Sequence, residues 1–388
     1  MKAEAILSAM NYIDEDILFD VENRKDKRNM VKGKTQHRLL IAAACIVFTA
    51  VSAVFINTVI SNNLPKLDLK ISKGDGMGFE GAFLKNPDDF ESGNPWEYSV
   101  FTSRMPVYES NSHDNKGTPC GLSEKQLEEN INKAVLALEE KNINTSKEWA
   151  NDLYGGYEND FVYCINAETD NTSITANAAG GISVFFKESI TCPYEFNPKS
   201  IEDAEKAAEY YTDKYSELIS SFIGFENPEI SISTDYNAYG EIHRTYRVYD
   251  SSGSKKDDIV NYNLNYAELR IENDGTLTSI YICNSESVTD KIAVYPIITE
   301  SNAEKKLIAG DYISSVVQYD FPGKEYIAKT DLVYKSEKGE TVAPYYRFIV
   351  ELPEAPDEIG IENYGVYYVP AVKDKYISDI TLIDGELQ

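Results

Sequence analysis

The chain has 388 residues, of which 37 are lysine or arginine and 64 are aspartate or glutamate, giving a formal net charge of −27 at pH 7. Almost all of the acidic excess lies after residue 60, because the first 60 residues carry nearly balanced charges. Such a surface repels nucleic-acid phosphates, so the composition argues against nucleic acid as a partner.

Residues 1–38 contain a short apolar stripe. Ile6, Met10, Ile13 and Ile17 recur at spacings of four, three and four, which predicts one face of an amphipathic helix. A helix of a few turns is marginal by itself, because it does not offset the entropy of ordering. The stripe therefore belongs either to a peptide that docks on a partner or to a disordered leader.

Residues 39–60 form an uncharged run of the sequence LLIAAACIVFTAVSAVFINTVI. As a helix this run covers about 33 Å, enough for the hydrocarbon core of a bilayer. Basic residues crowd before the run and not directly after it, and basic flanks stay in the cytoplasm. We therefore expect a single-pass membrane protein with a cytoplasmic N-terminal tail and an extracytoplasmic C-terminal part.

Two other interpretations of the run fit less well. A cleaved signal peptide has a shorter apolar core, and the run continues beyond the cleavage-like residues that end at Ala53. An acylated lipoprotein cysteine ends its apolar segment, whereas Cys45 lies early in this one. An uncleaved signal-anchor is the prediction.

Residues 61–121 are rich in glycine, asparagine, aspartate, serine and proline, which predicts a spacer between the membrane and a folded part. Three helices are expected after it. Ser123 with Gln126 begins the first, Ser200 begins a second that stops at Gly224, and Ser301 begins a third.

Strand patterns lie between and after these helices. A hairpin is expected around the Asn273-Asp274-Gly275 turn. Tyr262, Leu264 and Tyr266 alternate with asparagines, which predicts another strand. The other predicted strands are 161–166, 173–177, 182–187, 230–234, 346–352, 364–370 and 375–382. A helix followed by antiparallel strands, repeated along the chain, predicts an α+β fold with one unit at 122–198 and further units at 199–388.

The C-terminal third contains the runs Tyr295-Pro296-Ile297-Ile298-Thr299-Glu300, Asp331-Leu332-Val333-Tyr334, Ala343-Pro344-Tyr345-Tyr346-Arg347-Phe348 and Tyr367-Tyr368-Val369-Pro370-Ala371. In these runs it resembles the YycI-type and PepSY-like extracytoplasmic domains of Gram-positive bacteria. Residues 12–18 resemble the inner tails of clostridial anti-sigma-factor proteins. The resemblance implies a non-enzymatic regulator whose partner is a sigma factor, a sensor kinase or another membrane regulator.

Motifs for catalysis or metal binding are missing from the sequence. No spacing brings two of His37, His113 and His243 to one metal, and no phosphate loop, nucleophile elbow or dinucleotide fingerprint occurs. We therefore expect no enzyme activity and no cofactor. The four cysteines after the membrane run permit two disulfides or remain thiols, and both alternatives stay open: Cys120, Cys164, Cys192 and Cys283.

Tyrosine is unusually frequent, with 28 residues. Tyrosine suits a half-buried sheet face, and it also builds aromatic platforms for a glycan or a peptide. The candidate platform residues are Tyr345, Tyr346, Arg347, Tyr367 and Tyr368. The sequence thus predicts a membrane-anchored regulator or sensor, with a tethered module that binds wall polymer or peptide as the alternative.

Overall fold

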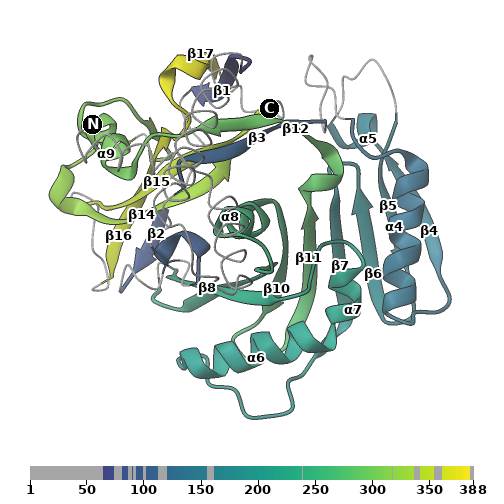
Figure 1. Cartoon of the computed structure of the whole chain (residues 1–388). Coiled ribbons are helices and arrows are strands. Elements are labelled where there is room, and N and C mark those ends of the chain that lie inside the picture. Colours follow the sequence, from purple (N-terminus) through teal and green to yellow (C-terminus); the bar gives the residue numbers. More distant parts are fainter. Residues whose placement is uncertain are drawn as a thin grey trace, which may run out of the picture. The chain divides into compact units, whose positions relative to one another are not determined.

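The computed structural model describes residues 64–73, 81–85, 90, 93–98, 102–111, 120–154, 161–237, 239–316, 318–335, 341–353 and 361–384 (Figure 1). The chain divides into two compact units, 1–66 and 67–388, and every described helix and strand lies in the second. The predicted tail at 1–38 and the predicted membrane helix at 39–60 lie outside the described residues. Within the described ranges, no helix has the length and apolar character needed to cross a membrane.

The larger sheet of the described part is antiparallel, with the strand order β4-β5-β6-β7-β11-β10-β9-β8. Its halves are two meanders that meet where β7 pairs with β11. The first half consists of β4 (Asn144–Trp149), β5 (Val162–Glu168), β6 (Thr172–Asn177) and β7 (Gly181–Ile190). The second consists of β8 (Pro228–Tyr236), β9 (Ile242–Asp250), β10 (Asn265–Ile271) and β11 (Leu277–Asn284).

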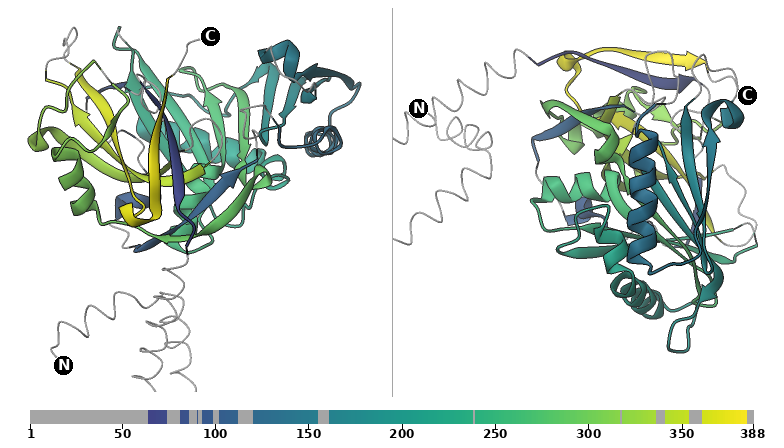
Figure 2. Two further views of the ribbon diagram at one scale, coloured as in Figure 1. Left: turned by 90° about the horizontal axis from the view of Figure 1, so that it is seen from above. Right: turned by 90° about the vertical axis from the view of Figure 1, so that its right-hand side faces the viewer.

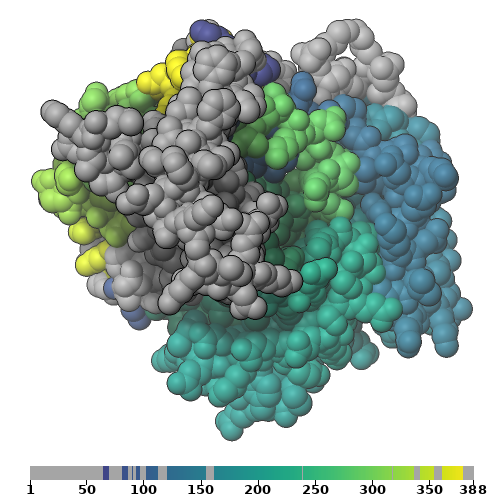
Figure 3. Space-filling view, in the orientation of Figure 1, coloured from purple at the N-terminus to yellow at the C-terminus, as the bar shows by residue number. Residues whose placement is uncertain are grey.

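Helices cover one face of this sheet. They are α4 (Glu124–Ala137), α6 (Ile201–Lys214) and α7 (Ser216–Ser220), and Figure 2 shows α4 lying along the strands. Ser123 and Gln126 form the expected capping box on α4, and Ser200 caps α6. In Figure 3 the first half, in blue, and the α6 region, in teal, form neighbouring parts of the visible surface. Leu127 and Ile131 of α4 and Ala204 and Ala208 of α6 belong to one apolar core with the inward strand residues.

The second sheet follows the order β12-β3-β15-β16-β13 in the described part, with β14 paired to β15 and β2 to β16. Its strands are β2 (Gly81–Leu84), β3 (Arg104–Ser110), β12 (Thr289–Pro296), β13 (Ile313–Ser314), β14 (Ile327–Lys335), β15 (Thr341–Glu351) and β16 (Glu362–Pro370). Helix α9 (Glu300–Ile308) packs against β16 and buries Ala303 and Leu307 in a separate core.

Shorter elements connect these layers. They are α5 (Ala150–Tyr154) and the 3₁₀ turns η2 (Pro95–Tyr98), η3 (Ser285–Val288), η4 (Lys324–Tyr326) and η5 (Asp374–Tyr376). The expectation of an α+β domain rich in antiparallel sheet is confirmed. The predicted boundary at residue 198 falls between two segments of the described chain that each contain one long helix and four strands, and these segments share one sheet because β7 pairs with β11.

The prediction of a spacer at 61–121 is wrong for its described residues. Strand β1 (Leu67–Lys73) pairs in parallel with β17 (Ile377–Asp384), while β2 and β3 join the second sheet. Leu67 and Leu69 are buried. Short strands between polar loops look like a linker in sequence, because their pairing partners lie more than 150 residues away in the chain.

The predicted strand through Tyr262 and Leu264 is also wrong. These residues lie in helix α8 (Lys255–Leu264), and only from Asn265 does the chain become β10. Ser254 and Asp257 form a capping box that begins this helix. The hairpin of β10 and β11 is confirmed, with Gly275 at a φ of 81° in its turn. The third predicted helix is confirmed with an earlier start, since Thr299 caps α9.

Candidate functional site

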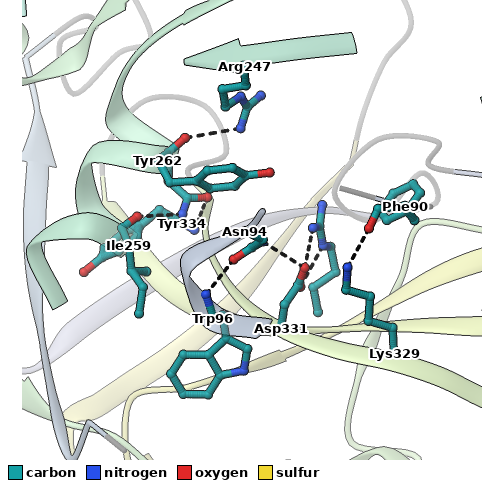
Figure 4. Close-up of polar contacts among 11 residues, drawn as sticks. Phe90, Asn94, Trp96, Arg247, Ile259, Tyr262, Lys329, Asp331 and Tyr334 are labelled. Atoms are coloured by element: carbon teal, nitrogen blue, oxygen red, sulfur yellow. Dashed lines mark hydrogen bonds and ion pairs between the residues drawn. The ribbon is translucent and has the colours of Figure 1, made fainter. Parts of the chain in front are cut away.

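A cavity of about 460 Å³ lies between the larger sheet, helix α8 and the second sheet. Helix α8 packs against β9 and β10 on one side and β14 on the other, and so separates the two sheets beside the cavity. The described residues that line it are Gly81, Phe90, Arg247, Tyr262, Asn263, Tyr266, Val333, Tyr334, Lys335, Arg347 and Val366. Figure 4 shows several of them and the polar contacts that hold them.

Arg247 of β9 enters the cavity from the larger sheet. Glu268 lies directly opposite on β10, and Arg247 Nη2 donates to Glu268 Oε1 at 2.8 Å. Arg247 Nη1 donates at 3.3 Å to the carbonyl of Tyr262, one of the C-terminal carbonyls that a helix leaves without an intrahelical donor. The guanidinium lies 5.0 Å from the Tyr262 ring and 4.0 Å from the Tyr266 ring. Arg247 thus joins the sheet, the end of α8 and an aromatic wall.

Arg347 of β15 enters from the second sheet and forms a buried ion pair with Asp331 of β14. The two residues are register partners, and the guanidinium donates from Nε at 2.9 Å and from Nη2 at 2.5 Å. Asp331 is 0% exposed and Arg347 5%. Asn94 Nδ2 also donates to Asp331 at 3.2 Å, and Asn94 Oδ1 accepts the Trp96 backbone N–H at 2.9 Å. Segment 93–98 is therefore attached to the cavity wall by this carboxylate.

Phe90 completes the Arg347 side of the cavity. Its ring centroid lies 5.2 Å from the guanidinium carbon of Arg347. Lys329 Nζ donates to the Phe90 carbonyl at 2.6 Å and positions that residue (Figure 4). The wall thereby repeats the combination found around Arg247, an arginine held by a carboxylate and packed against an aromatic ring.

Tyr266 and Tyr334 of the lining are neutral at physiological pH. Burial raises the pKa of Tyr334 well above its ordinary value, and its hydroxyl donates to the Pro106 carbonyl at 2.9 Å. Burial also raises the pKa of Tyr266, against the opposing effect of Arg247. Asn263 accepts the Tyr334 backbone N–H at 3.1 Å and donates to the Ile259 carbonyl at 2.8 Å, which ties α8 to β14.

Three cationic side chains line the cavity, from Arg247, Lys335 and Arg347, and no carboxylate side chain is among its described lining residues. Arg247 and Arg347 are paired with the carboxylates of Glu268 and Asp331, which are not among the described lining residues. Since the chain as a whole has a net charge of −27, a lining with three cationic side chains is unusual for this protein. The lining favours a small polar ligand that carries negative charge.

The platform residues predicted from sequence are brought together but are not exposed. Tyr345, Tyr346, Tyr367 and Tyr368 are all buried where β15 pairs with β16, so these rings do not form a surface platform. The Tyr346 hydroxyl donates to the Ile298 carbonyl and the Tyr367 hydroxyl to the Tyr319 carbonyl. Such burial with a hydrogen-bonded hydroxyl is the structural role of tyrosine in a sheet. Of the predicted set, Arg347 alone is among the described lining residues.

Other sequence hypotheses have different outcomes. Ile6, Met10, Ile13 and Ile17 lie outside the described residues. No disulfide joins the four cysteines that the structure describes. Among the residues of the described ranges, no group of three or more histidine, cysteine, aspartate or glutamate side chains is arranged to hold a metal ion.

The sequence interpretation missed Arg247, Tyr262 and Tyr266. Arg247 interrupts a strand otherwise rich in buried aromatic and aliphatic residues, and this was the available signal. The alternating pattern predicts one strand through Tyr262 and Tyr266, whereas Tyr262 lies in α8 and Tyr266 lies in β10.

Comparisons with known proteins find little. No protein-family model matches the chain, and no curated protein matches it in sequence. Among solved structures, an uncharacterized protein from Eubacterium rectale is similar over 74% of this chain and 86% of that chain, with 10% sequence identity and a TM-score of 0.34.

Proposed function

We propose that this chain is a membrane-anchored, non-enzymatic regulator whose extracytoplasmic domain binds a small organic anion in the cavity between its two sheets. The observation that carries the proposal is the cavity lining, in which Arg247, Lys335 and Arg347 accompany the rings of Phe90 and Tyr266. Buried arginines beside aromatic rings bind planar anions such as carboxylates well.

The membrane anchor and the orientation rest on the sequence. The uncharged run at 39–60 and its basic N-terminal flank support a cytoplasmic tail and an outer domain. The apolar stripe of the tail supports docking to a sigma factor, a sensor kinase or another regulator. Protease added to intact cells should then remove the C-terminal domain, and deletion of residues 2–38 should abolish signalling without affecting ligand binding.

The kinship with YycI-type and PepSY-like domains is also part of the proposal. The support comes from an order of elements that occurs twice in the described part of the larger sheet. Helix α4 precedes the four strands of one half, and α6 with α7 precedes the four strands of the other. Helix α9 precedes β13 to β16 in the same manner. A repeated helix-plus-antiparallel-sheet unit explains this order.

Ligand binding is tested by thermal stabilisation of the purified full-length chain. Glucuronate, citrate and inorganic phosphate are the anionic probes, and glucose is the neutral one. A ligand that binds only the folded state raises the melting temperature with concentration. We expect at least one anion to do so and glucose to have no effect. A chain that responds to none of the anions would refute the cavity as an anion site.

A matched pair of lysines controls for charge. Lys335 lies 5.2 Å from the Tyr368 ring centroid and lines the cavity, while Lys375 lies 4.6 Å from the Tyr376 ring centroid and does not line it. Lys335→Met should weaken anion binding about tenfold, which corresponds to roughly 1.4 kcal/mol. Lys375→Met should leave the affinity unchanged. Equal effects of both variants would mean that net charge, and not the cavity, attracts the anion.

A further inference from the structure

A row of side chains crosses the larger sheet on the face opposite α4, α6 and α7. Successive strands place its members directly opposite one another, and directly paired residues point to the same face. From β4 to β8 the row consists of Ser146, Asn166, Thr175, Ser183, Tyr281, Glu268, Arg247 and Ser231. The residues that alternate with it, such as Ile165 and Ile182, lie in the core beneath the helices. One register of the sheet is therefore polar across all of its described strands.

The part of the row on β4, β5, β6, β7 and β11 carries no charge. We call these five residues the neutral row: Ser146, Asn166, Thr175, Ser183 and Tyr281. Ser146 is exposed and the other four are half-buried, so their polar atoms lie at the surface of the sheet. Charged residues make up 26% of the chain, and the solvent face of a strand is where they are expected. Within the row, hydroxyls and an amide replace them, and the neighbouring carboxylates of Glu148 and Glu168 accept hydrogen bonds from Asn166 and Ser173. The row thus suits a partner rich in hydroxyl groups.

Hydrogen bonds fix the orientation of the row. Thr175 Oγ1 donates to Asn166 Oδ1 at 2.6 Å, and Asn166 Nδ2 donates to Glu148 Oε1 at 2.7 Å. The Thr175 oxygen still has lone pairs to accept a hydrogen bond, and the Asn166 amide has a second N–H to donate. The row therefore offers oriented donors and acceptors side by side, at the spacing of neighbouring strands, which is about 4.8 Å.

An aromatic ring stands beside the neutral row. Phe185 lies two residues after Ser183 on β7, on the same face, and is 51% exposed. Its register partners are Ser173 and Ser279, and the Ser173 hydroxyl donates to Glu168 Oε1 at 2.7 Å. A large exposed apolar ring beside polar side chains is typical of a binding surface.

We propose that the neutral row together with Phe185 binds a neutral oligosaccharide. Sugar hydroxyls both donate and accept hydrogen bonds, as the row does, and the C–H face of a sugar packs on the negative face of an aromatic ring. An anionic polymer would be repelled by the carboxylates of Glu148 and Glu168, which accept hydrogen bonds from Asn166 and Ser173. A peptide strand would need a sheet edge, which the row reaches only at Ser146 of β4, whereas the backbone groups at Thr175 and Ser183 are already paired within the sheet. This site is separate from the anion cavity and does not depend on it.

Calorimetric titration of the purified full-length chain in detergent micelles tests the proposal. The probes are tetrasaccharides of glucose in α-1,4 and β-1,4 linkage, of N-acetylglucosamine and of mannose, with tetragalacturonate as the anionic comparison. We expect at least one neutral tetrasaccharide to bind with a dissociation constant below about 1 mM, and more tightly than tetragalacturonate. Failure of every neutral probe to reach that affinity overturns the proposal.

Variants locate the binding. Phe185→Ala should weaken binding of the best neutral probe about tenfold and Thr175→Val severalfold, because a stacking ring contributes on the order of 1 kcal/mol. Leu136→Ala is the control, since Leu136 is 78% exposed on α4, on the other face of the sheet. Both changed residues are partly exposed, so the melting temperature should move by less than about 2 °C. Unchanged affinity in both row variants, or equal loss in the Leu136 variant, refutes the site.

The anion cavity and the neutral row are tested independently of each other. Lys335→Met should leave oligosaccharide binding at its original affinity, and Phe185→Ala should leave the stabilisation by anions unchanged. Loss of both activities in either variant would mean that the two ligands share one site, which overturns the separation proposed for the neutral row.

Discussion

The buried ion pair of Asp331 and Arg347 allows a quantitative prediction. Asp331→Ala removes the acceptor of two guanidinium hydrogen bonds and of one from Asn94, and it leaves a 5% exposed guanidinium without its carboxylate. Breaking a buried pair in this way costs about 3–5 kcal/mol of folding free energy. For a domain of this size roughly 2 °C of melting temperature corresponds to 1 kcal/mol, so the midpoint should fall by about 6–10 °C.

The double variant Asp331→Leu/Arg347→Met should behave differently. It removes both charges together with the cost of burying them, so its stability should lie within about 1 kcal/mol of the original chain or above it. The single variants Asp331→Leu and Arg347→Met complete a double-mutant cycle, and its coupling energy should be at least about 2 kcal/mol.

Denaturant unfolding followed by circular dichroism measures these differences. The control is Glu129→Ala, which breaks an exposed pair 3.5 Å from Lys125 on α4 and should cost no more than about 0.5 kcal/mol. The reasoning would be refuted by an Asp331→Ala loss as small as the Glu129→Ala loss, or by a double variant that is as unstable as the sum of its single changes.

Three further predictions concern pH, backbone strain and thiol reactivity. Burial raises the pKa of Tyr108 to about 12 and that of Tyr334 well above its ordinary value, so the folded state favours the neutral phenols. The stability that these two phenols contribute to the folded state is complete below about pH 10. Above that pH it is lost at up to about 1.4 kcal/mol per pH unit for each tyrosine. Melting midpoints measured from pH 9 to 11.5 should therefore fall less steeply in Tyr108→Phe than in the original chain. Gly275→Ala should destabilise the fold more than Gly310→Ala in urea titrations. Both glycines have φ near 80°, so both substitutions strain the backbone, but only at Gly275 would the new Cβ lie 2.6 Å from a Phe196 ring carbon. Cys164 should be the slowest of the described cysteines to alkylate at pH 8, as judged by peptide mass spectrometry, because burial raises its pKa to about 11; rapid labelling of the folded chain at this position would contradict that.

Local signals in the sequence located most elements of the fold. The capping residues Ser123 and Ser200 predict the starts of α4 and α6, and the Asn-Asp-Gly turn predicts the β10–β11 hairpin. These predictions succeed because caps and tight turns depend on contacts between residues only a few positions apart. The alternation around Tyr262 misled for the same reason. Tyr262, Leu264 and Tyr266 recur at every second position, as in a strand. The capping box of Ser254 and Asp257, however, begins helix α8, which continues to Leu264.

The candidate site depended on contacts that no local pattern encodes. Arg247 and Arg347 lie 100 residues apart and meet one cavity only because α8 separates two sheets. Tyr345, Tyr346, Tyr367 and Tyr368 were recognised as sheet residues, yet their burial followed from the layers packed around β15 and β16. An aromatic residue on a strand has the same local pattern whether its face is covered or open.

By itself, the sequence determined the acidic charge, the helices with their caps and the alternating strands, since charge and short-range hydrogen bonding are properties of neighbouring residues. Tertiary structure alone decided that β1, β2 and β3 belong to the sheets, that a polar row crosses eight described strands, and that two arginines face one cavity. The physical reason is that strand register and sheet packing are set by partners far away in the chain, whose contacts repay the entropy of bringing them together only once the whole domain has formed.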